Sequence, residues 1–247
     1  MSEKKEGTSK RQARREEIRR KERQQRLVLF GVIAAVALAI VALIVIPSIR
    51  SANAPIGEFV QVTPGTYTSV DGTSMGDPNA KAKIEIFEDY TCSACKVYSD
   101  SVEPQVIQEL VDTGQAYYVF YQFPFLDDRD ASKDSDRSAN AALCAAEQGR
   151  FWDYKKLLFA NQTGAVEQFS DKRLIAFAES LGLDITDFEA CYDDNRFQSQ
   201  INEEMALGRD KGITGTPTVF INGVDIAPGR VPTFEQIQQA VQAANGN

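Results

Sequence analysis

The residues of this chain with the most distinctive chemistry are two cysteines, Cys92 and Cys95, which are three positions apart. Two thiols at that spacing at the start of a helix can close into a disulfide that exchanges with thiols of other molecules. The partial positive charge of a helix N-terminus stabilises a thiolate, so Cys92 should ionise more readily than a free thiol. Cys95 lies on the same helix face and can attack a mixed disulfide formed at Cys92. The spacing therefore predicts redox chemistry, with Cys92 as the nucleophile and Cys95 as the resolving thiol.

The same pair could instead supply half of a zinc site, because many structural zinc ions are held by two such pairs. The remaining cysteines, Cys144 and Cys191, are far apart in the sequence, and the 247 residues include no histidine. The lack of imidazole also excludes hydrolysis by Ser-His or Cys-His pairs. We therefore expect no metal ion, and no cofactor other than a redox-active Cys92–Cys95 disulfide.

The elements around the pair have the pattern of an α/β domain. Residues 83–87, shortly before the pair, alternate charged and apolar side chains, and residues 116–123 are rich in Tyr, Val and Phe. Both segments are therefore predicted to be strands. Between them the pattern predicts one helix with Thr91 as its N-cap and a bend at Pro104. The two cysteines would then lie in the first turn of that helix.

The second half of the chain is predicted to be helical until a late hairpin. Residues from about 132 to 212 have helical periodicity and include a capping box that starts at Thr186. Strands at 218–221 and 224–226 flank an Asn-Gly turn. A last helix follows with Thr233 as its N-cap. A helical segment is thus inserted between the first strands and the hairpin.

The N-terminal part has the features of a membrane anchor. Residues 27–46 carry no charged side chain, and a helix of that length crosses a hydrocarbon layer of about 30 Å. The preceding residues 1–26 contain 11 Lys/Arg and 5 Asp/Glu. The positive-inside rule therefore places this tail in the cytoplasm and the following residues outside it. We expect residues 47–69 to be an extracytoplasmic linker and residues 70–247 to be the folded domain.

Two competing interpretations concern this N-terminal part. Residues 52–54 (Ala-Asn-Ala) have the small-x-small pattern of a signal-peptidase site, but the long charged tail and the long apolar run favour retention as an anchor. The basic tail could also suggest nucleic-acid binding, yet it contains no aromatic residue and acids interrupt it. We expect it to orient the chain and to contact anionic lipid heads, with no nucleic-acid partner.

All four cysteines follow the predicted span, so they would face a compartment in which disulfides persist. For Cys144 and Cys191 three interpretations stay open: a structural disulfide, which we favour, two buried free thiols, or a second catalytic pair. A disulfide that closes so long a loop could stabilise the fold by about 4 kcal/mol in the chain-entropy model.

Four sequence motifs carry a resemblance to a known family. They are residues 76–80 (GDPNA), 84–95 (IEIFEDYTCSAC), 141–152 (AALCAAEQGRFW) and 212–218 (GITGTPT). Over roughly residues 70–245 the chain resembles the DsbA-like family of bacterial thioredoxin-fold thiol:disulfide oxidoreductases, as a membrane-anchored member. The resemblance implies an α/β thioredoxin-like fold with a helical subdomain inserted at about residues 131–212.

The resemblance also implies which residues meet the substrate. In the family the Thr216–Pro217 peptide bond is cis and faces the sulfur of Cys92. The loop around it presents backbone groups that hold a client segment in an extended pose beside the disulfide. Thr216 and Pro217 are therefore candidate substrate-binding residues.

Two departures from the family pattern concern the cysteines. The best-known oxidases have Pro-His between them, where this chain has Ser93 and Ala94. The loss of that cation should make the pair a weaker oxidant. Many relatives also have a buried acid six residues before the first cysteine, and here Ile86 takes that position. Glu88, Asp89 or water would then have to accept the proton of the resolving thiol.

These observations give one leading function and three competing ones. The leading hypothesis is a membrane-anchored oxidase that acts on unfolded or cysteine-containing exported proteins and passes electrons to a quinone-linked membrane partner. A reductase or isomerase of the same fold would instead receive electrons from a thiol reductant. A thioredoxin-like peptide-binding module would keep Cys92–Cys95 as a merely structural disulfide. A sensor or maturation factor would serve one client only.

Overall fold

The computed structural model describes residues 31–33, 36, 38–39, 41, 56–128 and 132–246. The predicted cytoplasmic tail (1–26), most of the predicted transmembrane helix (27–46) and the possible cleavage site lie outside the described residues. Among the residues that are described, no helix combines the length and the apolar character needed to cross a bilayer. The chain divides into two compact units, and the described residues from 56 onward all belong to the second.

A mixed six-stranded sheet forms the centre of this unit, in the order β1-β2-β4-β3-β5-β6. The strands are β1 (Val70–Asp71), β2 (Ser74–Met75), β3 (Ala82–Glu88), β4 (Ala116–Gln122), β5 (Thr218–Ile221) and β6 (Val224–Asp225). The long strands β3 and β4 run parallel, and β5 pairs with β3 in the antiparallel direction. The apolar side chains of β3 and β5 are buried, as expected for strands covered on both sides, whereas the side chains of β4 alternate between buried and half-buried.

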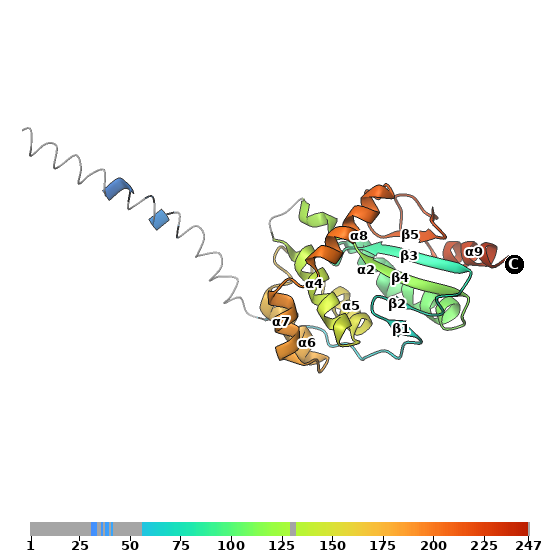
Figure 1. Cartoon of the computed structure of the whole chain (residues 1–247), viewed down its shortest axis with the longest axis horizontal. Coiled ribbons are helices and arrows are strands. Elements are labelled where there is room, and N and C mark those ends of the chain that lie inside the picture. Colours follow the sequence, from blue (N-terminus) through green and yellow to red (C-terminus); the bar gives the residue numbers. More distant parts are fainter. Residues whose placement is uncertain are drawn as a thin grey trace, which may run out of the picture. The chain divides into compact units, whose positions relative to one another are not determined.

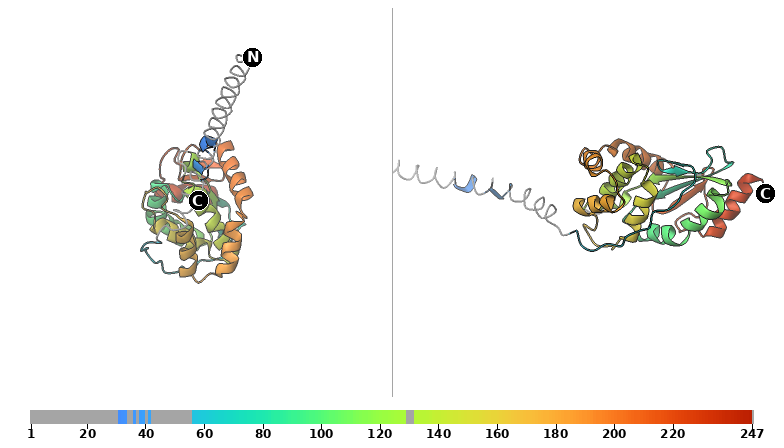
Figure 2. Two further views of the ribbon diagram at one scale, coloured as in Figure 1. Left: turned by 90° about the vertical axis from the view of Figure 1, so that its left-hand side faces the viewer. Right: turned by 90° about the horizontal axis from the view of Figure 1, so that it is seen from below.

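Helices cover both faces of the sheet and form a separate group at one end (Figure 1). They are α2 (Ser93–Ser101), α3 (Glu103–Val106), the π-helix η1 (Ile107–Val111), the 3-10 helix η2 (Phe125–Asp128), α4 (Asp134–Glu147), α5 (Phe151–Ala160), α6 (Asp171–Ser180), α7 (Ile185–Asp193), α8 (Gln198–Asp210) and α9 (Phe234–Asn245). The helices α4 to α8 all lie between β4 and β5 in the sequence. In Figure 2 the helices α6 and α7 lie at the end of the unit opposite α9 and the C-terminus.

The alternation of β3 sends its side chains to two different cores. Ile84 and Ile86 pack in the larger cluster together with residues of α2, α3, α5 and α9. Phe87 belongs to a smaller cluster on the other face, with Phe123, which follows β4, and Met205 of α8. Because side chains alternate along a strand, Glu88 lies on the same face as Ile86.

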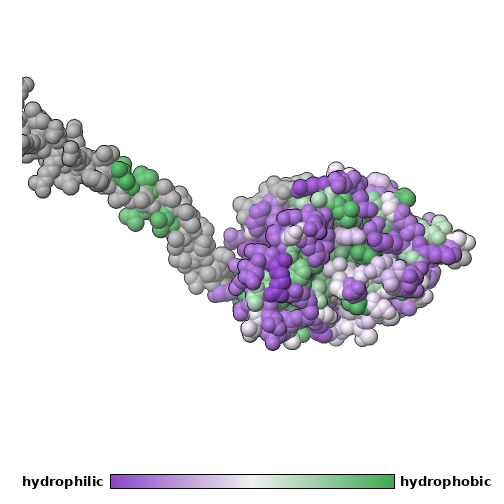
Figure 3. Space-filling model, in the orientation of Figure 1, coloured by the Kyte–Doolittle hydropathy of each residue, from purple (hydrophilic) through white to green (hydrophobic). Residues whose placement is uncertain are grey.

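Polar and charged side chains dominate the outer surface of the unit seen in Figure 3.

The helix that carries the cysteine pair differs from the predicted one. Its N-cap is Cys92, not Thr91, because the Thr91 hydroxyl donates instead to Asp89 Oδ1 at 2.8 Å. The helix also ends at Ser101, and a new helix, α3, begins with Pro104 in its first turn. Proline lacks an N–H and is accepted there without loss of a helical hydrogen bond. The predicted single bent helix is therefore two short helices and a π-helical turn.

The predicted caps were wrong at one further helix and right at another. Helix α7 begins at Ile185, because the side chain of Asp184 accepts a hydrogen bond from the Asp187 N–H at 3.0 Å. The predicted cap, Thr186, lies inside the helix. At α9 the capping box of Thr233 and Gln236 is formed as predicted. The hairpin of β5 and β6 also has the predicted Asn-Gly turn.

The described part of the predicted linker packs against the helical insertion. The backbone N–H and C=O of Val60 both bond to the side chain of Asn161, at 2.7 and 2.9 Å. The ring of Phe59 contacts the ring of Phe177 edge-on, with 4.9 Å between the centroids. The Gly65 N–H donates to Asp153 Oδ1 at 2.7 Å. The packed part of the unit therefore begins before residue 70.

Candidate active site

Cys92 and Cys95 lie where β3 passes into α2. The Cys92 N–H donates to the Asp89 carbonyl at 3.1 Å, and the Cys92 carbonyl accepts from the Lys96 N–H at 3.2 Å. Cys92 thus has extended dihedral angles at the head of the helix, while Cys95 lies one turn further in. Both are free thiols; Cys92 is partly exposed and Cys95 is completely buried. Only Cys92 is accessible to a thiol of another molecule.

The loop before β5 lies against Cys92. The Thr216–Pro217 peptide bond is cis, and the Cys92 Sγ lies 3.3 Å from the Thr216 carbonyl oxygen, to which it donates when the thiol is protonated. The register of β3 and β5, in which Phe87 opposes Thr218, holds this loop beside the end of β3. The structure therefore places all four of Cys92, Cys95, Thr216 and Pro217 in one site, and their roles in exchange stay predictions.

The two cysteines have opposite acidities. A hydrogen bond from the Cys95 thiol is the main factor that lowers the pKa of Cys92 to about 5. The side chain of Thr216 and the backbone N–H groups of Cys95 and Ala94 lower it further, against the effect of burial. Burial raises the pKa of Cys95 well above that of an ordinary thiol, and Cys92 and Glu88 add to the shift. At neutral pH Cys92 is a thiolate and Cys95 a thiol.

Three buried ionisable residues, Glu88, Lys155 and Glu103, form a cluster on the face of the sheet that carries Ile86. We call this cluster the ion triad. The Lys155 Nζ is 3.2 Å from Glu88 Oε2 and 2.6 Å from Glu103 Oε2. Glu88 and Lys155 are each 1% exposed, and Glu103 is 6% exposed. Tyr118 donates its hydroxyl hydrogen to Glu103 Oε1 at 2.9 Å. The ion triad thus joins side chains of β3, α3 and α5.

The triad contains one more carboxylate than its lysine can balance. Burial lowers the pKa of Lys155, but Glu103 and Glu88 outweigh this effect, and the net shift is upward. Lys155 is therefore charged. Burial raises the pKa of Glu88 to about 8, although Lys155 opposes the shift. Glu88 is thus the member of the triad that can take up or release a proton near neutral pH.

Asp89 is also buried, and its hydrogen bonds fix the loop before Cys92. Its carboxylate accepts hydrogen bonds from the Thr91 N–H at 2.8 Å, the Ser135 hydroxyl at 2.7 Å and the Leu126 N–H at 3.0 Å. Burial raises the pKa of Asp89 to about 6, against the effect of these donors. Because these contacts shape the loop and fix it to η2 and α4, we assign Asp89 a structural role.

Gln162 also holds this loop, and sequence reasoning did not single it out. Its side-chain amide donates to the carbonyls of Tyr90 at 2.7 Å and Cys92 at 3.0 Å. Gln162 follows α5, so the helical insertion reaches back to the start of the cysteine helix. No motif around Gln162 or Lys155 marked either residue, since a glutamine in a loop and a lysine in a helix are normally exposed.

The described residues contain no cluster of Asp, Glu and Cys that could hold a metal ion. The sequence model of the family described as Thioredoxin matches residues 68–243. The chain belongs to the thioredoxin family.

Individual relatives narrow the family further. The probable disulfide bond formation protein D of Bacillus anthracis is 25% identical over 173 residues, which span 68% of this chain and 76% of the relative. The oxidised BdbD structure of Bacillus subtilis has a TM-score of 0.63 and 22% identity, and covers 77% of this chain and 100% of that one. The Chlamydia trachomatis DsbA structure has a TM-score of 0.62 and 22% identity, with 78% and 98% covered.

These similarities confirm three of the predictions. The two structures show the thioredoxin-like α/β fold with its helical insertion. The family match and the relatives together confirm a DsbA-like protein and the enzyme class, protein thiol:disulfide oxidoreductase. Cysteine-containing proteins are the substrates that this class implies.

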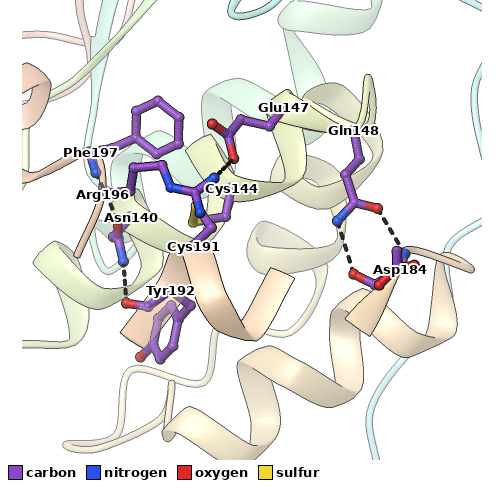
Figure 4. The surroundings of a disulfide bond; sticks show 9 residues. All are labelled: Asn140, Cys144, Glu147, Gln148, Asp184, Cys191, Tyr192, Arg196 and Phe197. Atoms are coloured by element: carbon purple, nitrogen blue, oxygen red, sulfur yellow. Dashed lines mark hydrogen bonds and ion pairs between the residues drawn. A yellow bond between two sulfur atoms is a disulfide. The ribbon is translucent and has the colours of Figure 1, made fainter. Parts of the chain in front are cut away.

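The other two cysteines join two helices of the insertion. Cys144 of α4 and Cys191 of α7 form a disulfide, and polar contacts flank it on both sides (Figure 4). Arg196 and Glu147 form an ion pair at 2.6 Å. Beyond it, the Gln148 amide and the backbone of Asp184 exchange two hydrogen bonds, at 3.0 and 2.8 Å. Cys144 and Cys191 are each 1% exposed, so the disulfide is closed to other thiols.

Proposed function

We propose that this chain is an oxidase, anchored in the membrane, which transfers its Cys92–Cys95 disulfide to cysteines of exported proteins. The observation that carries the proposal is the acidity of Cys92, whose pKa is lowered to about 5. Whatever stabilises the thiolate stabilises the reduced form, so the disulfide gives up its oxidising equivalents readily. The neighbouring thiol and two backbone N–H groups supply this stabilisation without the histidine of the best-known oxidases.

The reaction follows from the exposure of the two sulfurs. A client thiolate attacks the Sγ of Cys92, the Cys92–Cys95 bond breaks, and the electron pair leaves on Cys95, which takes up a proton. A second client thiolate then attacks the client sulfur of this mixed disulfide and releases Cys92 as a thiolate. The client has lost two electrons and gained a disulfide, and the enzyme pair is reduced. No cofactor other than the cysteine pair is needed in either step.

Two partners follow from this scheme. Unfolded proteins with reduced cysteines are the clients, and the loop at Thr216 and Pro217 would hold them through main-chain contacts, which accept many sequences. The reduced enzyme must then pass two electrons on, and we propose a quinone-linked membrane oxidase as the acceptor. A thiol reductant would take its place if the enzyme worked in the opposite direction.

The location rests on the sequence of the N-terminal part. The apolar run 27–46 follows a tail that is rich in Lys and Arg, which is the pattern of a single span with a cytoplasmic N-terminus. We propose that the span is retained and that residues 47–247 are extracytoplasmic, where disulfides persist. Membrane lipid is then a further partner of the chain.

The equilibrium of the Cys92–Cys95 pair with glutathione tests the direction of electron flow. We expect the pair to be reduced already at modest ratios of reduced to oxidised glutathione. A pair that stays oxidised in a large excess of reduced glutathione would identify a reductase instead. Ala94→His serves as a positive control, because a cation next to Cys92 should shift the equilibrium further toward the reduced form. Cys92→Ser is the negative control.

A further inference from the structure

A cavity next to the cysteine helix is lined by a second loop, Pro228–Val231. The cavity has a volume of about 400 Å³ and extends from Ala94 of α2 along residues 212–218 to Pro228–Val231. Thr216 and Ala94 line it, and the Thr216 carbonyl oxygen is 3.3 Å from Cys92 Sγ, so the cavity is adjacent to the reactive sulfur. A client segment held by the loop before β5 would therefore run past the loop of Pro228–Val231.

This second loop is a defined structure. The Arg230 N–H donates to the Ala227 carbonyl at 3.0 Å, which closes a turn, and the Ala227 N–H donates to Asp225 Oδ1 at 3.0 Å. Ala227 is 5% exposed, and Val231 packs against the larger core cluster. The turn is thus fixed at both ends, and it presents the side chain of Arg230 at the cavity.

Arg230 is an exposed cation at the cavity of a unit that is acidic overall. From residue 56 onward the sequence contains 15 Lys/Arg and 30 Asp/Glu, and cations such as Arg196 and Lys211 are held in ion pairs. The side chain of Arg230 is exposed and makes no ion pair or hydrogen bond with any described residue. The other charged residue of the cavity is Asp225, whose carboxylate already accepts the Ala227 N–H. The cavity therefore offers one guanidinium without a partner among the described residues, next to a carboxylate that a backbone N–H engages.

We propose that Arg230 is a specificity-determining residue, which favours client segments with a glutamate or aspartate close to the reacting cysteine. The proposal rests on the proposed function, because it concerns the client of the same exchange reaction. Main-chain contacts at the loop before β5 do not discriminate between side chains, whereas an unpaired guanidinium pairs with a carboxylate in a bidentate geometry. The acidic surroundings make the preference local, because elsewhere on the unit an acidic client is repelled.

The rate at which single-cysteine peptides reduce the Cys92–Cys95 disulfide of the full-length protein in detergent tests this. The peptides come in pairs of identical composition. In one peptide of each pair Glu is near the cysteine and Lys is remote from it, and in the other peptide Glu and Lys are exchanged. A scan moves the near site along both sides of the cysteine. Comparing each variant with the wild type cancels the effect of the Glu or Lys on the peptide thiol itself. Lys172→Gln is the matched control, because Lys172 is an exposed cation of α6 away from the cavity.

We expect Arg230→Gln to reduce the preference for nearby Glu roughly threefold, the size of a partly solvated ion pair. Arg230→Glu should invert the preference, Lys172→Gln should leave it unchanged, and the effect of Arg230 should fade at about 1 M salt. An unchanged preference in Arg230→Gln, with exchange still running, would overturn the inference and leave the proposed function standing. A rise in the pKa of Cys92 in Arg230→Gln would also overturn it, since Arg230 would then act on the enzyme thiolate. Failure of the wild-type disulfide to react with any peptide would instead refute the proposed function.

Discussion

At the scale of single residues, the pKa of Cys92 is lowered by hydrogen bonds from uncharged groups. Cys92 receives hydrogen bonds from a thiol and from backbone N–H groups, and its pKa falls to about 5. The ionisable group that acts on the cysteines is Glu88, which raises the pKa of Cys95. It lies two residues after Ile86, on the same face of β3. A buried acid is thus present near the cysteines, although the position that relatives use for it holds an isoleucine. Its lysine partner comes from α5, which no local pattern could indicate.

Glu88→Gln should change how stability depends on pH. Because burial raises the pKa of Glu88 from its ordinary value of 4.5 to about 8, the folded protein keeps a proton that the unfolded chain releases. The contribution of Glu88 to folding is therefore present below pH 4.5 and is lost as the pH rises through about 8. Denaturant unfolding at several pH values should show Glu88→Gln gaining stability relative to the wild type over this range. Glu85→Gln, on the opposite face of β3, is the control, and an identical pH slope in Glu88→Gln and wild type would refute the assignment.

Lys155→Met should destabilise the fold by about 3–5 kcal/mol, because it leaves two buried carboxyl groups without their cation. The neighbouring Lys156 is exposed, so Lys156→Met should change the free energy of unfolding by no more than about 0.5 kcal/mol. Chemical denaturation of both variants at neutral pH gives the comparison. Equal stabilities of the two variants would show that the ion triad does not hold α5 against β3.

At the scale of elements, strands and the hairpin follow from local patterns, and contacts between distant elements do not. The strands near 83–87 and 116–123 and the hairpin after Pro217 could be predicted because alternation and turn residues are local signals. The cap at Thr91 failed because its hydroxyl donates to Asp89, and the cap at Thr186 failed because Asp184, two residues earlier, accepts from the Asp187 N–H. The contacts of Gln162 with the cysteine loop link segments about 70 residues apart, so they were visible only in the structure.

The disulfide between α4 and α7 should act on stability and not on catalysis. Replacing both Cys144 and Cys191 by Ala should lower the free energy of unfolding by up to about 4 kcal/mol, since the unfolded chain regains the freedom of a long loop. Exchange at Cys92 should continue at temperatures where the variant stays folded, because the buried disulfide is closed to clients. Thermal unfolding and the glutathione equilibrium of the double variant measure the two effects separately. Loss of exchange in a folded double variant would point to a second redox pair.

At the scale of the whole molecule, the sequence divides into a basic tail, an apolar run and an acidic folded unit, and these parts suggest a protein held at the outer side of a membrane. The thioredoxin-like fold and the enzyme class could be predicted from sequence because the Cys-x-x-Cys and Thr-Pro motifs are local. The start of the packed unit could not, because the segment around Val60 has no regular pattern of its own and is held through the side chain of Asn161.

The proposed anchor predicts how the full-length chain partitions. Two charges in the middle of the span, Ala35→Arg with Ala39→Arg, cost about 5–7 kcal/mol for insertion together. We expect the wild type to stay with membranes after an alkaline wash and the double variant to be released or not inserted. Ala35→Leu with Ala39→Leu is the control and should remain bound. A mature wild-type chain that starts after residue 54 would show instead that the span is removed.

Measuring the pKa of Cys92 tests the proposed function, because both the exchange mechanism and the proposed direction of electron flow depend on it. Alkylation of the reduced full-length protein across pH, followed by mass analysis of the labelled peptides, reports the thiolate fraction at each cysteine. We predict that the Cys92 rate rises with a midpoint near pH 5 and is level at neutral pH, while Cys95, Cys144 and Cys191 stay unlabelled. A Cys92 midpoint near 9, the ordinary value for a thiol, would contradict the account.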